Sequence, residues 1–316
     1  MSAVSDFGVL NKALEWTRAG KDVVVATVIQ AWGSAPRKPG AHMAITTKRI
    51  FWGSVSGGCI EGNIISAAQD ILLGGKARLM DFGVSNEQAW KVGLTCGGQI
   101  TIWLEQIPKE VLECVCAAID KRERCGMYLS LTEDIPASFV GDGSIQQAEK
   151  RLTSIGYIRV YPPKRRIFIT GAVHIAQALI NLLKLLPFEV VLIDPRSIFL
   201  HPKRWGDIKR VELYPDEYFA TQSLNERDAV VALSHDPKID DPALLYALKT
   251  SVFYIGALGS RKSHAARVQR LHEKGCTSEQ VARIHGPIGL DISAQTPVEI
   301  AVAITAEIIA HQGSTR

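Results

Sequence analysis

Residues 166–194 place the strongest constraint on the fold of this chain. They read in order as a strand, a glycine turn, a helix, a second strand and an acidic residue: Arg166–Thr170, Gly171–His174, Ile175–Leu186, Phe188–Ile193 and Asp194. This order is that of the βαβ unit in dinucleotide-binding folds. The pattern therefore predicts an α/β chain whose residues 165–316 form a Rossmann-like domain with a doubly wound parallel sheet.

The glycine turn departs from the usual dinucleotide-binding sequence at one position. In Gly-x-Gly-x-x-Gly the second glycine lets the backbone approach a pyrophosphate, but here Val173 stands in its place. A β-branched side chain fills that space and resists a positive φ. The Rossmann-like fold is therefore expected, whereas ordinary NAD(P) binding is not.

The rest of the C-terminal half repeats the alternation of strands and helices that a parallel sheet requires. Strands are predicted at residues 229–234 and 252–255, and helices at 242–248 and from Pro297, behind the N-cap Thr296. In open α/β sheets the carboxyl ends of the strands line the ligand crevice. Four residues are predicted to bind a ligand there: Gly171, His174, Asp194 and His235.

Length, charge and cysteine content limit the class of protein. A chain of 316 residues is long enough for about two domains. The net charge of +4 is small and argues against nucleic acid as the main partner. No run of about 18 apolar residues is present, and charged residues interrupt the N-terminal segment, so neither a membrane span nor a signal peptide is expected. Six cysteines without an export signal indicate free thiols and a cytoplasmic protein.

The N-terminal half mixes helices and strands, which predicts a mixed α/β cofactor domain over residues 1–110. An amphipathic first helix precedes a buried strand at 22–30 and a hairpin that enters a glycine-rich loop. Residues 111–164 contain one helix and little further periodicity. They are interpreted as a variable middle and linker before the Rossmann-like domain.

The loop Gly53-Ser-Val-Ser-Gly-Gly-Cys-Ile-Glu-Gly62 holds four glycines in ten residues. A helix is predicted from Glu61 to Leu73, so Cys59 lies at or just before a helix N-terminus, where the helix dipole favours a thiolate. The glycines let backbone N–H groups approach an anionic ligand. Five residues are predicted to bind a cofactor: Ser56, Gly57, Gly58, Cys59 and Glu61. A buried corner with an inert cysteine is the alternative.

A second cysteine corner, Gly93-Leu-Thr-Cys-Gly-Gly98, directly precedes a predicted strand at 99–106. Cys96, Gly97 and Gly98 are predicted to bind the same cofactor, with Cys59 and Cys96 as metal ligands if the two corners converge. A structural zinc site is not expected, because no close Cys-x2-Cys pairs are present. Arg37 and Lys38, in the Pro- and Gly-rich loop 32–40, face either an anionic ligand or solvent.

Six motifs occur in order along the chain and carry a family resemblance: Ser34-Ala-Pro-Arg-Lys-Pro-Gly-Ala, Gly53-Ser-Val-Ser-Gly-Gly-Cys-Ile-Glu, Gly93-Leu-Thr-Cys-Gly-Gly, Ser234-His-Asp-Pro-Lys-Ile-Asp-Asp-Pro-Ala, Tyr254-Ile-Gly-Ala-Leu-Gly-Ser-Arg and His285-Gly-Pro-Ile-Gly-Leu-Asp-Ile. Together they resemble the XdhC/CoxI family of xanthine dehydrogenase accessory proteins. The likeness covers nearly the whole chain except residues 110–160. Where that family usually reads Gly-Ala-Gly-His, this chain reads Gly171-Ala-Val-His174.

The resemblance implies a cytoplasmic accessory protein, commonly a homodimer. Such a protein binds molybdenum cofactor and assists its sulfuration and insertion into a molybdenum hydroxylase apoenzyme, with a cysteine desulfurase as a further partner. Molybdopterin carries a dithiolene-bound metal and a phosphate, sometimes extended to a dinucleotide. Thiolates suit a soft metal, and helix N-termini suit a phosphate. No catalytic residue is predicted, so a carrier is favoured over an enzyme. An NAD(P)-dependent oxidoreductase and a thiol-transfer protein that uses Cys59 are the alternatives.

Overall fold

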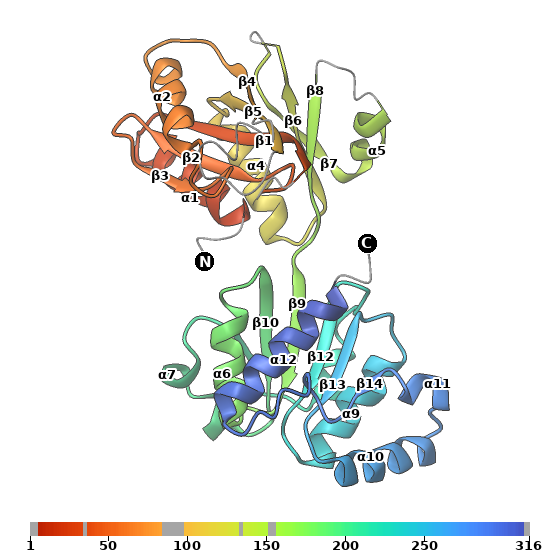
Figure 1. Cartoon of the computed structure of the whole chain (residues 1–316). Coiled ribbons are helices and arrows are strands. Elements are labelled where there is room, and N and C mark those ends of the chain that lie inside the picture. The colour runs from red at the N-terminus through yellow and green to blue at the C-terminus, as the bar shows by residue number, and fades with distance from the viewer. Residues whose placement is uncertain (1–5, 34–36, 84–97, 133–134, 151–155, 313–316) are drawn as a thin grey trace. The chain divides into compact units, whose positions relative to one another are not determined.

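The structure is a computed structural model that describes residues 6–33, 37–83, 98–132, 135–150 and 156–312. It divides into two compact units, Met1–Pro163 and Lys164–Arg316 (Figure 1). The first unit contains two sheets and the second unit one, and each unit has its own hydrophobic core clusters.

A five-stranded antiparallel sheet forms the centre of the first unit, in the order β3-β2-β1-β5-β4. Its strands are β1 (Val23–Gly33), β2 (His42–Thr46), β3 (Phe51–Gly53), β4 (Arg78–Gly83) and β5 (Gly98–Glu105). β1 pairs with β2 on one side and β5 on the other, with a register shift between Val28 and Gln30. The nearly continuous apolar run Val23–Ile29 of β1 is explained by this central place, because both faces of the strand are buried over these residues.

Helices cover both faces of this sheet. The side chains of Val24, Ala26 and Val28 pack with α2 (Glu61–Leu72). Val23 and Val25 point to the other face, where they pack with α1 (Asp6–Arg18) and α4 (Lys109–Asp120). The strand's two-residue side-chain period therefore divides one apolar segment between two separate cores.

The segment interpreted as a variable middle forms part of this first unit. It contains β6 (Cys125–Ser130), β7 (Ser138–Gly141), α5 (Asp142–Lys150) and β8 (Gly156–Tyr161), and the strands pair in the antiparallel order β7-β6-β8. Met127, Leu129 and Tyr161 join the same core as α1 and α4. Cys125, which has no sequence context to explain it, is buried there on β6.

A buried polar chain links the two sheets of the first unit. The His42 ring contacts Thr27 Oγ1 through Nδ1 at 3.0 Å and the Tyr161 hydroxyl through Nε2 at 2.8 Å. Burial, followed by the charges of Arg159 and Arg37, lowers the pKa of His42 to about 3, so the ring is neutral at pH 7. Burial acts in the opposite sense on Glu105, whose pKa rises to about 7 despite hydrogen bonds from Trp103 and the Ala137 N–H.

His42 and Glu105 are expected to make opposite pH-dependent contributions to the free energy of unfolding. Below pH 6.5 His42 takes up a proton only in the unfolded chain, so its contribution to stability falls as the pH falls. Glu105 binds its proton in the folded chain from about pH 7 down to 4.5, so its contribution rises over the same range. We expect the two to cancel between pH 4.5 and 6.5 in the parent chain.

Glu105→Gln is expected to expose the contribution of His42. Its free energy of unfolding should fall by about 1.4 kcal/mol per pH unit from pH 6.5 to 4.5. Urea denaturation at four pH values checks this, with Glu113→Gln, an exposed partner of Arg18, as the control that keeps the parent's profile. A Glu105→Gln profile as flat as the parent's would contradict the assignment.

The second unit is built on a six-stranded parallel sheet in the order β11-β10-β9-β12-β13-β14. Its strands are β9 (Arg165–Thr170), β10 (Phe188–Ile193), β11 (Lys209–Val211), β12 (Asp228–Ala232), β13 (Tyr254–Ala257) and β14 (Ile284–His285). The order runs outward from β9 in both directions, as in doubly wound Rossmann folds. The predicted Rossmann-like sheet is confirmed.

Helices lie on both faces of the parallel sheet. α6 (His174–Leu183) and α12 (Pro297–Gln312) pack on one face. The other face carries α8 (Pro215–Phe219), α9 (Pro237–Leu248) and α10 (Arg261–Glu273). Three short elements complete the unit: the 3-10 helix η1 (Ser197–Leu200), α7 (Pro202–Trp205) and α11 (Ser278–Val281).

Two helix starts in this unit have clear sequence causes. The predicted start of α12 is confirmed by reciprocal bonds, in which the Glu299 carboxylate accepts from the Thr296 N–H and the Thr296 hydroxyl accepts from the Glu299 N–H. α9 starts five residues before the predicted Pro242, because Asp236 caps it through the Lys238 N–H and Pro237 fills the first position.

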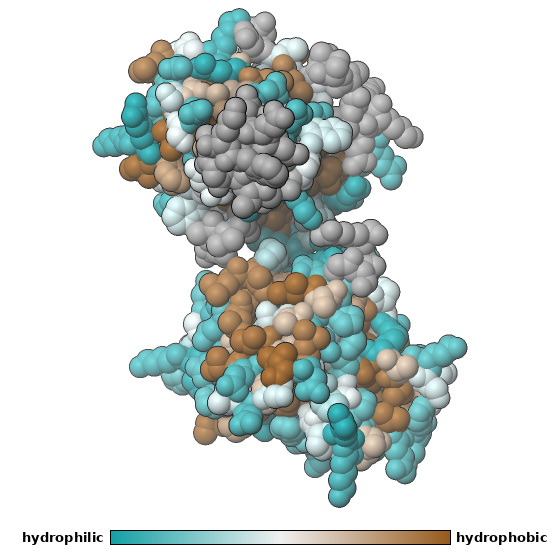
Figure 2. All heavy atoms as spheres, viewed as in Figure 1, coloured by the Kyte–Doolittle hydropathy of each residue, from teal (hydrophilic) through white to brown (hydrophobic). Residues whose placement is uncertain are grey.

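Apolar side chains gather on the face of the second unit that carries α6 and α12, as Figure 2 shows. On α12 three exposed apolar residues recur at helical spacing: Val298, Val302 and Ile309. Leu185, just after α6, is 65% exposed. In the part of the chain that the structure describes, no helix has the length and apolar character needed to cross a membrane.

Candidate functional site

The glycine-rich loop 53–62 leaves the five-stranded sheet at the end of β3 and leads into α2. Gly53 has a φ of +89°, and a Cβ there would lie 2.5 Å from the His42 carbonyl oxygen. Antiparallel pairing places Gly53 beside Met43 and Gly33 beside Gly98. The loop therefore starts at the same end of the sheet at which β5 begins.

The carboxylate of Glu61 holds this loop from inside. Its Oε1 accepts bonds from the Ser54 hydroxyl at 2.6 Å, the Ser56 N–H at 3.0 Å and the Gly57 N–H at 3.1 Å. Its Oε2 accepts from the Ser56 hydroxyl at 2.5 Å, the Gly58 N–H at 2.9 Å and the Ile60 N–H at 3.3 Å. Burial alone would raise the pKa of Glu61, but the bonds from Ser54 and Ser56 lower it to about 2.

This network changes the interpretation of the loop. From the sequence, its N–H groups were expected to point at an anionic ligand. In the structure the N–H groups of Ser56, Gly57 and Gly58 already bind a carboxylate that the chain itself supplies. The glycines remain necessary, since φ is +83° at Gly57 and +123° at Gly58. The loop is thus a fixed support rather than an open phosphate cradle.

The side chain that this support presents is Cys59. Cys59 is exposed, whereas its neighbours in the loop Ser56 and Glu61, which bond each other, are buried. Cys59 precedes α2 by two residues. Because it is exposed, the inert buried corner considered from the sequence is not what the structure shows.

Cys96 and Gly97 lie outside the described residues, and Gly98 begins β5. The convergence of Cys59 with Cys96 therefore stays a prediction. Among the described residues, no three His, Cys, Asp or Glu side chains form a group that could hold a metal ion.

The strand order of the second unit reverses between β9 and β12, the place at which open α/β sheets have their ligand crevice. The turns after these strands touch closely: a Cβ on Gly171 would lie 2.6 Å from the Ser234 nitrogen, and φ at Gly171 is +98°. Gly171 is therefore needed for the packing of two turns. His174, the first residue of α6, and His235 are exposed at this carboxyl edge.

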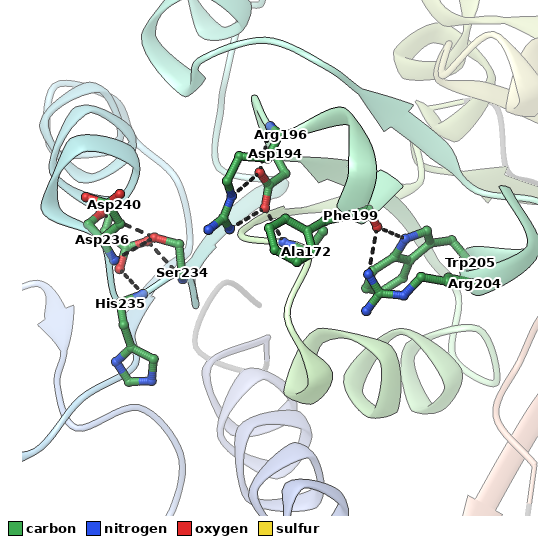
Figure 3. Close-up of polar contacts among 10 residues, drawn as sticks. All are labelled: Ala172, Asp194, Arg196, Phe199, Arg204, Trp205, Ser234, His235, Asp236 and Asp240. Atoms are coloured by element: carbon green, nitrogen blue, oxygen red, sulfur yellow. Dashed lines mark hydrogen bonds and ion pairs between the residues drawn. The ribbon is translucent and has the colours of Figure 1, made fainter. Parts of the chain in front are cut away.

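Asp194 directly follows β10, and its carboxylate bonds the backbone of the glycine turn. Its fully buried carboxylate accepts the Ala172 N–H at 2.7 Å and two bonds of 2.8 Å from the Arg196 guanidinium (Figure 3). Burial would raise its pKa, but the bonds from Arg196 and Ala172 hold it below the usual range. In NAD-binding folds an acidic residue near this position binds ribose. Here the carboxylate is already neutralised by Arg196.

The turn after β12 is filled in the same way. Asp240 accepts the Ser234 N–H at 3.1 Å, the Ser234 hydroxyl at 2.7 Å and the His235 N–H at 3.1 Å (Figure 3). Burial raises the pKa of this carboxyl, against the opposing effect of the Ser234 bonds. His235 adopts a φ of +63°, which is costly outside glycine, and its side chain is left exposed.

Sequence reasoning missed Arg196 and Asp240 as organisers of these turns. The only local signals are an arginine two residues after Asp194 and an aspartate six residues after Ser234. Neither spacing is specific, because a carboxylate that bonds turn N–H groups resembles any surface aspartate in sequence.

Comparisons with known proteins agree with this architecture. A family model described as the XdhC and CoxI family matches residues 16–83, and one described as the XdhC Rossmann domain matches residues 167–308. The chain is 27% identical to the molybdenum cofactor insertion chaperone PaoD of Escherichia coli (strain K12), over 95% of this chain and 86% of that protein. It is 29% identical to a probable xanthine dehydrogenase subunit of Bacillus subtilis (strain 168), over 92% of this chain and 93% of that protein.

A solved structure shares the fold. The crystal structure of a xanthine dehydrogenase from Bacillus halodurans covers 100% of this chain and 97% of its own, with a TM-score of 0.84 and 24% identity. The two family models match the chain in order, one in each unit, and the curated relatives extend over nearly its whole length. The chain belongs to the XdhC and CoxI family.

Proposed function

We propose that this chain is an accessory protein that binds molybdenum cofactor and assists its sulfuration and insertion into a xanthine dehydrogenase-type molybdenum hydroxylase. The observation that carries the proposal is the exposed Cys59 thiol on a loop that Glu61 fixes from below. The names of the relatives, a cofactor insertion chaperone and a probable component of xanthine dehydrogenase, support the same role.

The chemistry of the cargo suits these residues. Molybdenum cofactor supplies a soft dithiolene-bound metal and an anionic phosphate, in either a mononucleotide or a dinucleotide form. Cys59 offers a soft sulfur donor, and its backbone is held before the cargo arrives, so little ordering is needed on binding. Cys96 is a candidate second thiolate, and Gly171, His174 and His235 are candidate contacts for a nucleotide end. Asp194 then acts by positioning the glycine turn.

Transfer of the cargo requires other proteins. We propose a homodimer in the cytoplasm that meets the hydroxylase apoenzyme, with a cysteine desulfurase as the sulfur source. The apolar side chains exposed on α12 support contact with another protein chain.

Replacing Cys59 tests the proposal. Cys59→Ala purified from a molybdenum-replete host should retain about tenfold less molybdenum and pterin than the parent, since a metal ligand is lost. Metal analysis and pterin fluorescence measure both parts of the cargo. Cys114→Ala removes another exposed thiol, on α4, and should retain as much as the parent. If Cys59→Ala retains as much molybdenum and pterin as the parent, Cys59 is excluded as the metal ligand. If the variant retains the cofactor but loses the bound sulfur, the thiol-transfer alternative is favoured.

A further inference from the structure

Two arginines converge on one carboxylate in the first unit, away from Cys59 in sequence. Arg37 Nη2 lies 2.9 Å from Asp6 Oδ1, and Arg159 Nη2 lies 3.4 Å from Asp6 Oδ2. Arg37 comes from the loop before β2, Arg159 from β8 and Asp6 from the start of α1. About 150 residues thus separate Asp6 from Arg159 along the chain, and only the folded unit brings the three together.

The Arg159 guanidinium packs against Gly40 and the Tyr161 ring. A Cβ on Gly40 would lie 2.5 Å from its Cζ, Nε and Nη1, and φ at Gly40 is +87°. The positive φ favours glycine at this position, and a side chain there would displace the Arg159 guanidinium. On the other side the guanidinium lies over the Tyr161 ring, with Cζ 5.4 Å from the ring centroid, and Tyr161 is bonded to His42. These contacts orient the positive group before any ligand binds.

The cluster has more positive charge and more donors than its protein partners use. Within the described residues it sets two guanidinium charges against the single carboxylate of Asp6, and His42 below it is neutral at pH 7. The Nε atoms of both arginines are buried and have no hydrogen-bond partner in the described structure. Buried donors without partners are uncommon and call for an explanation. About a quarter to a third of each arginine side chain is exposed, so a small ligand can reach the pair.

We propose that Arg37 and Arg159 form a binding site for the phosphate group of a phosphomonoester or pyrophosphate ligand. Guanidinium groups match phosphate oxygens with paired, charge-assisted hydrogen bonds, and two of them exceed what Asp6 can neutralise. The loop of Arg37 enters the sheet at the end where loop 53–62 leaves it, since His42 and Gly53 flank Met43 at that end. The site therefore fits the phosphate end of the pterin cargo, and this identification, unlike phosphate binding itself, rests on the proposed function.

Titration with inorganic pyrophosphate tests the site without any cargo. Calorimetry on the full chain at constant ionic strength should show saturable binding at about 1 mM or tighter. Arg159→Gln and Arg37→Gln should each weaken it about tenfold, the effect of one lost charged hydrogen bond. Arg18→Gln removes an arginine from another exposed ion pair and should bind as the parent does. Unchanged binding in Arg159→Gln would overturn the proposal.

Asp6→Asn separates an anion site from a purely structural ion pair. If the arginines bind phosphate, removal of the competing carboxylate should tighten pyrophosphate binding about threefold or more. If the cluster only joins α1 to β8, the same variant should lose thermal stability and gain no affinity, and that result would exclude the site. Arg159→Lys keeps the charge without the paired donors, and binding at the parent's strength would show that a specific phosphate fork is absent.

The two proposals fail independently. Pyrophosphate binding that is lost in Arg159→Gln, together with a parent that carries no molybdenum or pterin, would retain the phosphate site and reject the carrier role. Cargo retention that depends on Cys59 but is the same in the parent and in Arg159→Gln would retain the carrier and reject the arginine pair as its phosphate site. Loss of both pyrophosphate and cargo in Arg159→Gln would support the combined assignment.

Discussion

Glu61→Ala is expected to lower the free energy of unfolding by about 3 kcal/mol and to remove most cargo retention. The buried carboxylate accepts bonds from two hydroxyl groups and four backbone N–H groups. Alanine removes the acceptor of all six donors, and those that water cannot reach stay without a hydrogen bond. The loop then loses the conformation that presents Cys59. Urea denaturation followed by tryptophan fluorescence gives the stability, and metal analysis gives the retention.

The control for this prediction is Glu299→Ala. Glu299 also bonds two N–H groups before a helix, those of Gln295 and Thr296, but it is exposed and lies in the second unit. It should lose less stability and leave cargo retention unchanged. Glu61→Gln keeps the size of the side chain but turns an N–H₂ group toward donors, and should fall between parent and Glu61→Ala. If Glu61→Ala were as stable as the parent, the loop N–H groups that bond Glu61 would have to be hydrogen-bonded to water in the variant, and the prediction would be wrong.

Elements whose signal is local could be predicted from the sequence. The βαβ unit follows from apolar runs of strand length on either side of Gly171, and β9, α6 and β10 occur where that pattern places them. The start of α12 follows from the spacing of Thr296, Pro297 and Glu299, which specifies a cap by itself. The sequence could not decide whether Cys59 is exposed or buried, because a glycine-rich loop before a helix is found in both situations.

Features that depend on distant partners could not be predicted. The sheet β7-β6-β8 consists of short strands whose burial comes from α1 and α4, so residues 125–161 carry little periodicity of their own. Strand β8 of that sheet brings Arg159 to the carboxylate of Asp6, which also pairs with Arg37. Nothing in the sequence around Arg159 indicates this contact. The direction of a carboxylate is equally hidden: Glu61, Asp194 and Asp240 all bond turn N–H groups that the sequence suggests are open to a ligand.

These three carboxylates have a common consequence for binding. A backbone N–H that already bonds an internal carboxylate offers a phosphate nothing without displacing it, and displacement leaves a buried charge unpaired. The side chains of Cys59, His174 and His235 are exposed at these turns, and we propose them as the groups that contact a ligand. We therefore expect ligand selection in this chain to depend on side chains at the turns, whereas nucleotide-binding turns use the backbone itself.

Asp194→Asn is expected to destabilise the second unit by about 3 kcal/mol. Oδ2 of Asp194 accepts from the Ala172 N–H and Arg196 Nη2, and Oδ1 accepts from the Arg196 N–H and Nε. An asparagine oxygen can replace only one of these two oxygens, so in either orientation its N–H₂ group faces two donors and two bonds become repulsive contacts. Hydrogen exchange of peptides from residues 165–194 should show faster exchange in β9 and β10. Asp236→Asn, in the same crevice, should show no change, because asparagine caps α9 as well as aspartate does.

The same arrangement predicts how the parent responds to nicotinamide cofactors. The N–H of Ala172 is bonded to Asp194, Val173 fills the space of a glycine, and Asp194 is paired with Arg196, so neither the pyrophosphate nor the ribose of NAD(P)H finds its usual partner. Titration with NADH and NADPH should give no saturable change in tryptophan fluorescence below about 1 mM. Saturable binding at micromolar concentration would mean that Asp194 swings away from the turn. Such binding would favour the NAD(P)-dependent oxidoreductase over the carrier, since the turn would then accept a nicotinamide dinucleotide in the absence of the cargo.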